Sequence, residues 1–316
     1  MINLGLLGCG TVGNGVVEIL NERKEFLEKH LGESIAIKKI LVRNLENYKD
    51  REDFNIFTDD IYEIIDDEEI ETIIEVTGNI DQIFPAILKA MENQKNIVTA
   101  NKAMISRHME QLIEYADYHD VKFYYDAAVA GAVPIIESIK NIANLNEIKS
   151  IQGVLNGTCN FILSSMEEGK DYQSALQEAQ DIGFAEADPT DDVEGYDTMR
   201  KLRILSTLAF KEKVSEEDIS LKGITEISID DIKTLNEQGE RYKLVASAYR
   251  EKGKVIAKVE PTIVKKDSVI GGLVNGQNAI IVEGDNCGEL AFKGPGAGGR
   301  PTGFAILTDV LNIYKD

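Results

Sequence analysis

The sequence of 316 residues predicts an α/β fold, in which a doubly wound parallel sheet is joined to a second domain of mixed α+β type. Short apolar runs alternate with segments of helical spacing as far as about residue 133. After Pro134 the pattern changes to helices and then to strands separated by Gly and Asn turns. The content of 43% hydrophobic and 28% charged residues is typical of a globular protein long enough for two cores.

The first domain is predicted from elements that alternate along the chain. We expect strands at 2–7, 35–42, 72–76, 97–99 and 121–125, and helices at 12–29, 81–92 and 106–118. This order is typical of right-handed crossover units on a parallel sheet. An amphipathic helix over 301–314 follows a glycine-rich loop and is expected to fold back on this domain, which therefore covers residues 1–133 with 298–316.

The second domain is expected over residues 134–297. Its predicted helices cover 135–143, 161–168, 172–182 and 196–210, and its predicted strands cover 242–250, 255–260, 279–283 and 289–292. Turn residues between these strands favour an antiparallel sheet.

The charge and the cysteines limit the possible partners and the compartment. There are 34 Lys and Arg against 55 Asp and Glu, and this net charge of −21 opposes binding to nucleic acid and to anionic membranes. No apolar run approaches the ~20 residues that span a bilayer, and no export signal precedes residue 8. The three cysteines, Cys9, Cys159 and Cys287, fit neither a disulfide framework nor a structural zinc site, so a reducing cytoplasm is expected.

A glycine motif follows the first predicted strand. Gly8, Gly10 and Gly13 form G-x-G-x-x-G, with Thr11 and Val12 inside it, between a strand and a helix. In a Rossmann-type nucleotide domain the first glycine permits a tight turn, the second admits the pyrophosphate, and the third allows close packing of helix and strand. The helix N-terminus offers N–H groups to the phosphates. The alternative is a glycine turn that only lets the helix pack.

The end of the second predicted strand bears on the choice of cofactor. No acidic residue stands there to hold an adenosine ribose, and Arg43 occupies the position instead. Because a guanidinium suits a 2′-phosphate, the sequence favours NADP over NAD. The alternative is an ordinary surface arginine, with Glu46 free to bind the ribose from the loop.

Two lysines are candidates for chemistry. Lys102 follows the 97–99 strand, so it lies beyond a carboxyl end of the sheet, where open α/β folds bind ligands. Asp197 and Lys201 are four residues apart on a predicted helix, which places carboxylate and ammonium on one face. Such a pair is usually an exposed salt bridge, but the apolar positions around it on the helix suggest partial desolvation and a role in proton transfer.

Together these motifs resemble homoserine dehydrogenase in its short form, without an appended C-terminal regulatory domain. The resemblance covers nearly the whole chain and lies in residues 8–13, 99–103, 127–131, 155–163, 183–201 and 294–309. It implies reversible hydride transfer between a nicotinamide cofactor and a small molecule, interconverting L-homoserine and L-aspartate 4-semialdehyde in threonine and methionine biosynthesis.

The resemblance also implies roles for individual residues. Lys201 matches the proton donor and Asp197 a carboxylate that contacts the substrate. Glu186 matches the acid that holds the substrate amino end, Lys102 matches a second lysine beside substrate and cofactor, and Thr158 borders the substrate. An ammonium near the substrate oxygen would stabilise and protonate the alkoxide that develops during reduction.

Further positions match the cofactor and ion sites of the family. Thr99, Gly183 and Gly303 match cofactor-side positions. The resemblance also implies a sodium ion, held by the carbonyls of a segment that follows the last strand of the nucleotide domain, and a homodimer formed through the sheet of the second domain. The residues matching that sodium site are Asp126, Val129, Gly131 and Val133, with Asp126 standing where the family usually has Glu.

Three other functions stay open at this point. Aspartate-semialdehyde dehydrogenase shares the nucleotide fold but needs a cysteine nucleophile, for which Cys159 is the candidate. A redox sensor could bind NAD(P) without chemistry, in which case Asp197 and Lys201 are structural. A dehydrogenase of another small amino or hydroxy acid would use the same residues on a different substrate.

Overall fold

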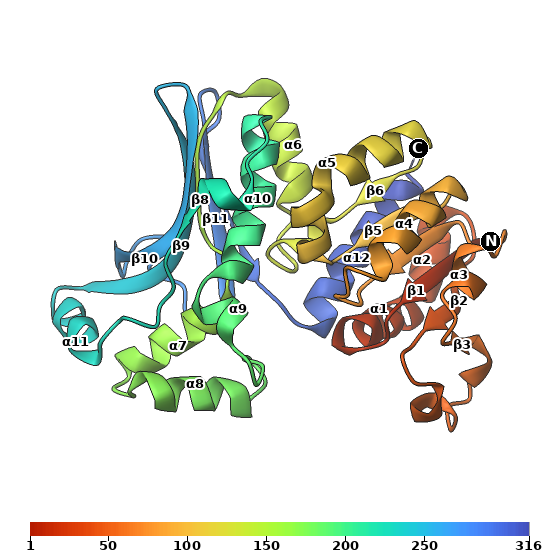
Figure 1. Cartoon of the computed structure of the whole chain (residues 1–316), viewed down its shortest axis with the longest axis horizontal. Helices are drawn as coiled ribbons and strands as arrows, with labels where there is room; N and C mark the ends of the chain where they lie inside the picture. The colour runs from red at the N-terminus through yellow and green to blue at the C-terminus, as the bar shows by residue number, and fades with distance from the viewer. Residues whose placement is uncertain (316) are drawn as a thin grey trace. The chain divides into compact units, whose positions relative to one another are not determined.

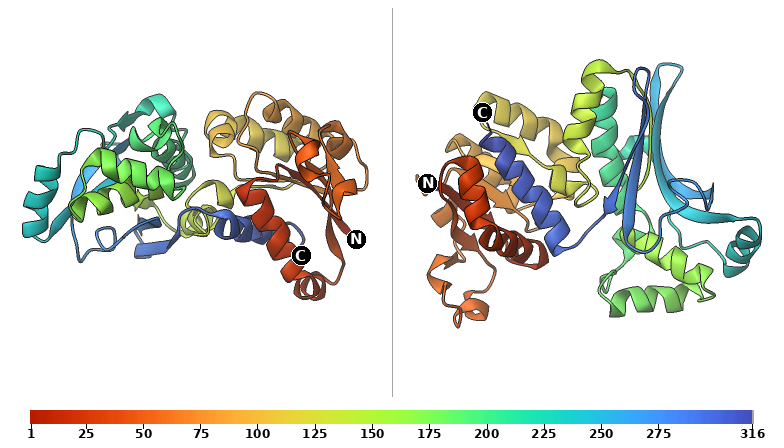
Figure 2. Two further views of the ribbon diagram at one scale, coloured as in Figure 1. Left: turned by 90° about the horizontal axis from the view of Figure 1, so that it is seen from below. Right: turned by 180° about the vertical axis from the view of Figure 1, so that it is seen from behind.

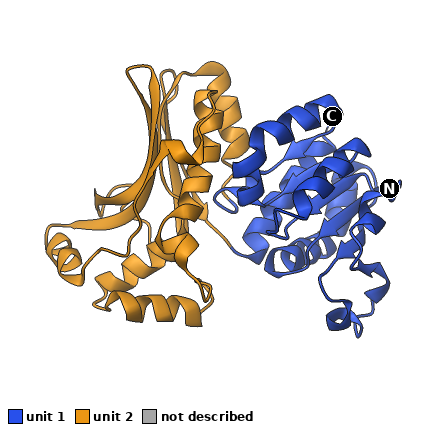
Figure 3. Cartoon of the chain, viewed as in Figure 1, with its two compact units in different colours: residues 1–132, 298–316 blue, residues 133–297 orange. Residues whose placement is uncertain are grey.

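The computed structural model describes residues 1–315 and confirms the predicted α/β fold class. The chain forms two compact units (Figure 3). Unit 1 comprises Met1–Ala132 and Gly298–Asp316, and unit 2 comprises Val133–Ala297.

Unit 1 is built on a six-stranded parallel sheet of order β3-β2-β1-β4-β5-β6 (Figure 1). The reversal of strand order between β1 and β4 is the arrangement of a doubly wound fold. The strands are β1 (Ile2–Leu7), β2 (Ile35–Leu41), β3 (Phe57–Thr58), β4 (Thr72–Glu75), β5 (Asn96–Thr99) and β6 (Phe123–Tyr124). The helices are α1 (Thr11–Glu22), α2 (Lys24–Leu31), α3 (Tyr62–Ile65), α4 (Ile83–Glu92), α5 (Lys102–Tyr118) and α12 (Gly299–Ile313), with short 3-10 turns η1 (Leu45–Tyr48), η2 (Phe54–Ile56) and η3 (Asp126–Ala128).

The core of unit 1 lies on both faces of its sheet. Leu4 and Leu6 of β1 pack into a cluster with residues of α1 and α12, whereas Leu7 packs into a second cluster with residues of α4 and α5. All three are fully buried, as expected for a central parallel strand that is covered on both sides.

Helix α12 returns the chain to unit 1 and lies along α1 (Figure 2). Glycines make this close crossing possible. A Cβ on Gly15 would lie 2.2 Å from the carbonyl oxygen of Gly299, and one on Gly303 would lie 2.8 Å from the carbonyl carbon of Gly15. At the far end of the helix, the hydroxyls of Tyr314 and Thr72 are 2.7 Å apart and hydrogen-bonded.

Two predicted helices of unit 1 differ from the structure. The helix expected over 12–29 is two helices, because Arg23 leaves helical geometry with φ −111° and ψ 10°. The helix expected from residue 106 begins earlier, at Lys102. Its start is fixed by Asn101, whose side-chain oxygen accepts the Met104 N–H at 3.0 Å.

Unit 2 is built on a mixed six-stranded sheet of order β12-β11-β7-β9-β10-β8, antiparallel except for the β10–β8 pair. The strands are β7 (Ile148–Val154), β8 (Ile219–Leu221), β9 (Glu240–Glu251), β10 (Lys254–Lys265), β11 (Gln277–Gly284) and β12 (Gly288–Pro295). The helices are α6 (Ile136–Leu145), α7 (Gly157–Glu167), α8 (Tyr172–Asp181), α9 (Thr190–Val193), α10 (Tyr196–Phe210) and α11 (Ile229–Glu237), with the 3-10 turn η4 (Glu216–Asp218). Strand β7, which the sequence pattern missed, joins β11 to β9 in the middle of this sheet.

The two faces of this second sheet differ. The face bearing Ile151, Ala248 and Ile280 is buried beneath helices that include α7 and α10. Their neighbours along the strands, Tyr249 and Ile281, are only half-buried. The alternation therefore leaves one face of the sheet less covered than the other within a single chain.

Candidate active site

The glycine loop of unit 1 has the geometry that a pyrophosphate needs. Gly8 has φ +106°, which favours glycine, and a Cβ on Gly13 would lie 2.2 Å from the Gly8 carbonyl oxygen. A Cβ on Gly10 would meet nothing within 4 Å, so the space above this glycine is open. Helix α1 begins directly afterwards at Thr11, and Val12 lies in its first turn.

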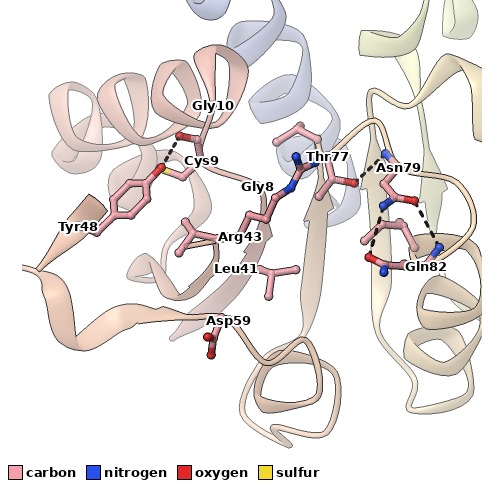
Figure 4. A pocket seen from close by; sticks show the side chains of 13 residues that line it. Gly8, Cys9, Gly10, Leu41, Arg43, Tyr48, Asp59, Thr77, Asn79 and Gln82 are labelled. Atoms are coloured by element: carbon pink, nitrogen blue, oxygen red, sulfur yellow. Dashed lines mark hydrogen bonds between the residues drawn. The ribbon is translucent and has the colours of Figure 1, made fainter. Parts of the chain in front are cut away.

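A pocket of about 510 Å³ opens beside this loop, which is a size that ligand sites commonly have. Its lining comes from the loop, from the residues after β2 and β4, and from the start of α4. Figure 4 shows the Arg43 side chain extending toward Thr77, with Asp59 on the opposite side. Tyr48 closes one end, where its hydroxyl donates to the Cys9 carbonyl at 3.2 Å. Arg43 therefore lines the pocket.

Glu75 is a buried carboxylate behind this pocket that sequence reasoning missed. It ends β4 with 0% exposure, and burial raises its pKa. The Thr77 N–H and hydroxyl donate to Oε1 at 2.8 and 2.7 Å, and the Thr99 hydroxyl donates to Oε2 at 2.6 Å. Thr99 Oγ1 in turn accepts the Asn101 N–H at 3.0 Å. One carboxylate thus connects the pocket wall to the loop that leads to Lys102, the first residue of α5.

In unit 2 the predicted lysine and aspartate form a close, buried pair. Lys201 Nζ donates to Asp197 Oδ2 at 2.7 Å and to the Leu155 carbonyl at 2.8 Å. Their side chains are only 12% and 7% exposed. The interpretation of this pair as an exposed salt bridge is therefore wrong, because both groups are largely removed from water.

Two residues that sequence reasoning did not select complete this cluster. Asn156 Nδ2 donates to Asp192 Oδ1 at 2.6 Å and to Asp197 Oδ2 at 2.9 Å. Burial raises the pKa of Asp192, and the negative charge of Asp197 adds to this effect. Asp192 lies in segment 183–201 of the resemblance and Asn156 in segment 155–163, but nothing in the sequence shows that the two side chains are in contact.

Cys159 lies beside this cluster but does not fit a nucleophile. It is fully buried, its thiol donates to the Asp192 carbonyl at 3.1 Å, and burial raises its pKa well above the ordinary value. A reactive cysteine needs the opposite conditions. The geometry disfavours the aspartate-semialdehyde dehydrogenase alternative.

The remaining predicted residues of unit 2 are Thr158 on α7 and Gly183 and Glu186 on the loop before α9. Thr158, at the start of α7, donates its hydroxyl to the Phe184 carbonyl at 2.8 Å, which ties that loop to the helix. Gly183 has φ +77° and is exposed, as is Glu186, whose backbone carbonyl accepts Gln180 Nε2 at 3.0 Å. The Glu186 carboxylate is thus presented to solvent on a loop anchored by Thr158.

The residues predicted to surround sodium form a sharp turn after β6. Asp126 and Val129 are buried, and the Asp126 N–H donates to Asp309 at 3.0 Å. Ala130 and Gly131 both have left-handed backbone, with φ 59° and 58°. Val133 is the first residue of unit 2.

Over residues 1–315, no group of three or more His, Cys, Asp or Glu side chains is placed to hold a metal ion. Within the same range, no helix is both long and apolar enough to cross a membrane.

A doubly wound sheet with an open glycine loop, together with a second unit carrying a buried lysine–aspartate pair, defines a nucleotide-dependent oxidoreductase. Comparison with known proteins identifies the family. Residues 8–126 match the family model described as homoserine dehydrogenase, NAD binding domain, and residues 134–311 match the model described as homoserine dehydrogenase. The chain belongs to the homoserine dehydrogenase family.

Individual relatives agree with this assignment. A homoserine dehydrogenase of Bacillus subtilis is 38% identical over 317 residues, covering 100% of this chain and 73% of the relative. A crystal structure of a homoserine dehydrogenase from Thiobacillus denitrificans matches with a TM-score of 0.94 at 34% identity, covering 99% of this chain and 73% of that one. A hyperthermophilic archaeal homoserine dehydrogenase in complex with NADPH matches with a TM-score of 0.83 at 26% identity, covering 98% and 97% of the two chains.

The family assignment fixes the reaction and the type of cofactor. The chain is an NAD(P)-dependent enzyme that interconverts L-homoserine and L-aspartate 4-semialdehyde. The alternatives of a non-catalytic redox sensor and of a dehydrogenase for another small acid are set aside, because both family models name this enzyme and together they cover most of the chain.

Proposed function

We propose that Lys201 exchanges the proton of the homoserine dehydrogenase reaction, and that Asp197 holds this lysine in place and contacts the substrate. The observation that carries the proposal is the pair itself. Lys201 is nearly buried and has two fixed acceptors, Asp197 Oδ2 at 2.7 Å and the Leu155 carbonyl at 2.8 Å. An ammonium that is fixed by two acceptors and shielded from water is suited to stabilising a developing alkoxide.

The two directions of the reaction require different protonation states of Lys201. When bound, the nicotinamide cofactor supplies or accepts the hydride. During reduction of the semialdehyde, the Lys201 ammonium donates its proton to the substrate oxygen as negative charge develops there. During oxidation of homoserine, the neutral amine of Lys201 accepts the hydroxyl proton. In that second transfer, positive charge forms on Lys201 Nζ, which lies 2.7 Å from Asp197 Oδ2.

Further residues are proposed to bind the substrate. Glu186 carries an exposed carboxylate that suits the substrate ammonium, and Thr158 fixes the loop from which Glu186 projects. Lys102 at the N-terminus of α5 is proposed to bind beside substrate and cofactor.

The residues of unit 1 fit a dinucleotide. Gly8, Gly10 and Gly13, with the N–H groups of Thr11 and Val12, would hold the pyrophosphate, because the space above Gly10 is open and α1 begins beside it. Arg43 projects into the adjoining pocket and would bind a 2′-phosphate, so we propose a preference for NADP over NAD. Thr99 and Gly183 are proposed cofactor-side residues. Gly303 is proposed to act through the close crossing of α12 and α1.

The central experiment measures NADPH formation from homoserine and NADP by absorbance, for the wild type and for Lys201→Ala. We expect turnover to fall about 10³-fold, because a positioned acid–base group contributes roughly 10²–10⁴-fold, while NADP affinity stays the same. The matched control is Lys222→Ala, since Lys222 forms an exposed pair with Glu226, also four residues apart. Near-normal turnover of Lys201→Ala would contradict the proposal.

A sodium ion is proposed at the turn after β6. The left-handed backbone at Ala130 and Gly131 turns a buried segment sharply, and the carbonyls of Val129, Gly131 and Val133 would supply the oxygen ligands that suit a hard cation. The Asp126 carboxylate would add a charged ligand. Thermal unfolding in sodium chloride and in choline chloride tests this proposal. An equal Tm in the two salts would contradict it.

A homodimer and a reducing compartment are also proposed. The half-buried face of the unit 2 sheet, with Tyr249 and Ile281, is proposed to meet the same face of a second copy. Light scattering after size-exclusion chromatography would show a mass of about twice 35.0 kDa. The unpaired Cys9, Cys159 and Cys287 fit a reducing cytoplasm.

A further inference from the structure

The side chain of Asn156 connects two buried carboxylates. This residue caps α7 and is 3% exposed, and its Oδ1 accepts the Cys159 N–H at 2.8 Å. Its Nδ2 donates one hydrogen bond to Asp192 Oδ1 at 2.6 Å and another to Asp197 Oδ2 at 2.9 Å. Its side-chain oxygen and nitrogen therefore both have partners, and both N–H groups of its amide point at carboxyl oxygens.

We propose that Asn156 is a positioning residue for the reaction: its amide keeps Asp192 and Asp197 as two separately ionised carboxylates, so that Asp197 stays fixed against Lys201. This inference rests on the proposed roles of Asp197 and Lys201. Asn156 lies 41 residues before Asp197 in the chain. It is proposed to take no part in the hydride or proton transfer and to act only through the two aspartates.

The physical reason is the repulsion between neighbouring carboxylates. Two such groups close together cannot both ionise easily, and one of them retains a proton to a higher pH. An amide that donates to both offsets this repulsion without adding charge. Without the amide, a proton shared by Asp192 and Asp197 would compete with the Lys201 ammonium for Asp197 Oδ2.

The charged groups around the amide come from three elements. Asp192 faces it from α9, and Asp197 faces it from α10, with Lys201 one turn further along. On α7 itself the thiol of Cys159 donates to the Asp192 carbonyl. Glu194 lies at the end of α9 and adds a further negative charge, which acts on Cys159. Arg200 faces Asp197 from the same helix but is paired with Asp191.

The second acceptor of Lys201 is held in a similar way. The Leu155 carbonyl, which accepts Lys201 Nζ, also accepts Asn278 Nδ2 at 3.0 Å. Asn278 lies on β11 and is fully buried. Each of the two acceptors of Lys201 is therefore hydrogen-bonded to a buried asparagine, Asp197 to Asn156 and the Leu155 carbonyl to Asn278. This arrangement supports the proposal that asparagines position the acceptors of Lys201.

A matched pair of variants tests the proposal. Asn156→Asp keeps the shape of the side chain and the capping oxygen, since Asp and Asn are both strong N-cap residues, but replaces the bridging amide with a third carboxylate. Asn160→Asp makes the same change one turn along α7 at an equally buried residue. The Asn160 amide contacts Lys243 and the carbonyls of Asn275 and Gln277, and no carboxylate.

The readout is the pH dependence of kcat/KM for homoserine, together with NADP affinity. For Asn156→Asp we expect the acid limb to move up by about one pH unit or more, because a like charge raises the pKa of neighbouring carboxylates. We also expect kcat/KM at pH 7 to fall at least about tenfold with unchanged NADP affinity. Asn160→Asp should keep the wild-type profile. A wild-type profile for Asn156→Asp, or the same shift in both variants, would overturn the proposal.

Two further variants keep the outcomes distinct. Asn156→Ser retains a capping hydroxyl but is too short to bridge two carboxylates, so it answers the question if Asn156→Asp does not fold. Its kcat/KM should fall by about tenfold, and wild-type kcat/KM would count against the proposal.

Asp197→Asn is measured in parallel. Full activity of Asp197→Asn and Lys201→Ala would refute the proposed function itself, whereas loss of activity there with a normal Asn156→Asp refutes only the role of Asn156.

Discussion

Each unit of the molecule buries a carboxylate, and the two are held in different ways. Glu75 of unit 1 accepts hydrogen bonds from two threonine hydroxyls and a backbone N–H, all of which are neutral. Asp197 of unit 2 accepts one hydrogen bond from the Asn156 amide and one from the Lys201 ammonium. The neutral donors around Glu75 can only hold the backbone in place. The ammonium of Lys201, in contrast, carries a proton that a substrate could accept.

This difference in hydrogen-bond donors suggests a structural role for Glu75 and a role in the reaction for Asp197. Glu75 links the residues that line the pocket beside the glycine loop to the loop before Lys102, so its loss should lower stability and, if the proposed cofactor site is right, weaken cofactor binding. Asp197 fixes Lys201, the group proposed to exchange a proton, so loss of Asp197 should lower turnover. Three further measurements test this distinction.

Glu75→Ala should destabilise the protein by roughly 2–3 kcal/mol, because it leaves the buried donors of Thr77 and Thr99 without their acceptor. NADP affinity should fall as well, since Thr77 lines the pocket. Urea unfolding and a fluorescence titration with NADPH provide the measurements. Glu75→Gln serves as the shape-matched control and should lose less stability. Equal stability of Glu75→Ala and the wild type would show that the frame does not depend on this carboxylate.

Lys243 is the cationic counterpart of Glu75. It is fully buried in β9, its ammonium donates to the neutral oxygens of Asn160 and Leu273, and burial lowers its pKa to about 8. Between about pH 8 and the ordinary lysine value near 10.4, the unfolded chain binds more protons than the folded one. Lys243 therefore adds stability as pH rises through this window, by at most about 1.4 kcal/mol per pH unit.

The check for Lys243 is urea unfolding from pH 7 to 10 for the wild type and Lys243→Met. The variant should lack this part of the rise. Below about pH 8 the cost of burying the ammonium is constant, so the two slopes should agree there. Parallel curves over the whole range would contradict the assignment to Lys243.

Arg43→Ala should have the smallest effect of the three. Loss of a charged contact to the 2′-phosphate should weaken NADP binding by about tenfold, near the lower end of the roughly 1.5–3 kcal/mol of hydrogen bonds to charged groups, and should leave NAD binding nearly unchanged. Paired KM measurements with the two cofactors provide the test. An equal loss for both would mean that Arg43 does not read the 2′-phosphate.

The sequence predicted the parts of the site that depend on local spacing. The glycine loop at Gly8 and the pair of Asp197 and Lys201 are patterns within six residues, and both have the predicted geometry. Contacts made across the fold left no such pattern. Asn156 lies 41 residues from Asp197, and Glu75 lies 24 residues from Thr99. A glutamate at the end of the apolar run in β4 was the one available signal for a buried carboxylate.

The fold was predictable to a similar degree. The alternation of strands and helices indicated the doubly wound sheet, because its period is visible within a few residues. The break at Arg23 and the strand β7 were missed. Arg23 is an ordinary helix former, so tertiary packing decides where α1 ends. Strand β7 mixes Lys149, Ser150 and Gln152 among apolar residues, which weakened its pattern although both of its neighbours pair with it.

The crossing of α12 over α1 bears on how the polypeptide acquires its structure during synthesis. Unit 1 is discontinuous, and all of unit 2 is translated between its two pieces. A ribosome making a few residues per second therefore releases the first 132 residues long before the helix that covers Gly15 has emerged. Until then, the surface of α1 that α12 will cover stays exposed. Unit 2 is thus the first part of the nascent chain that can be completed.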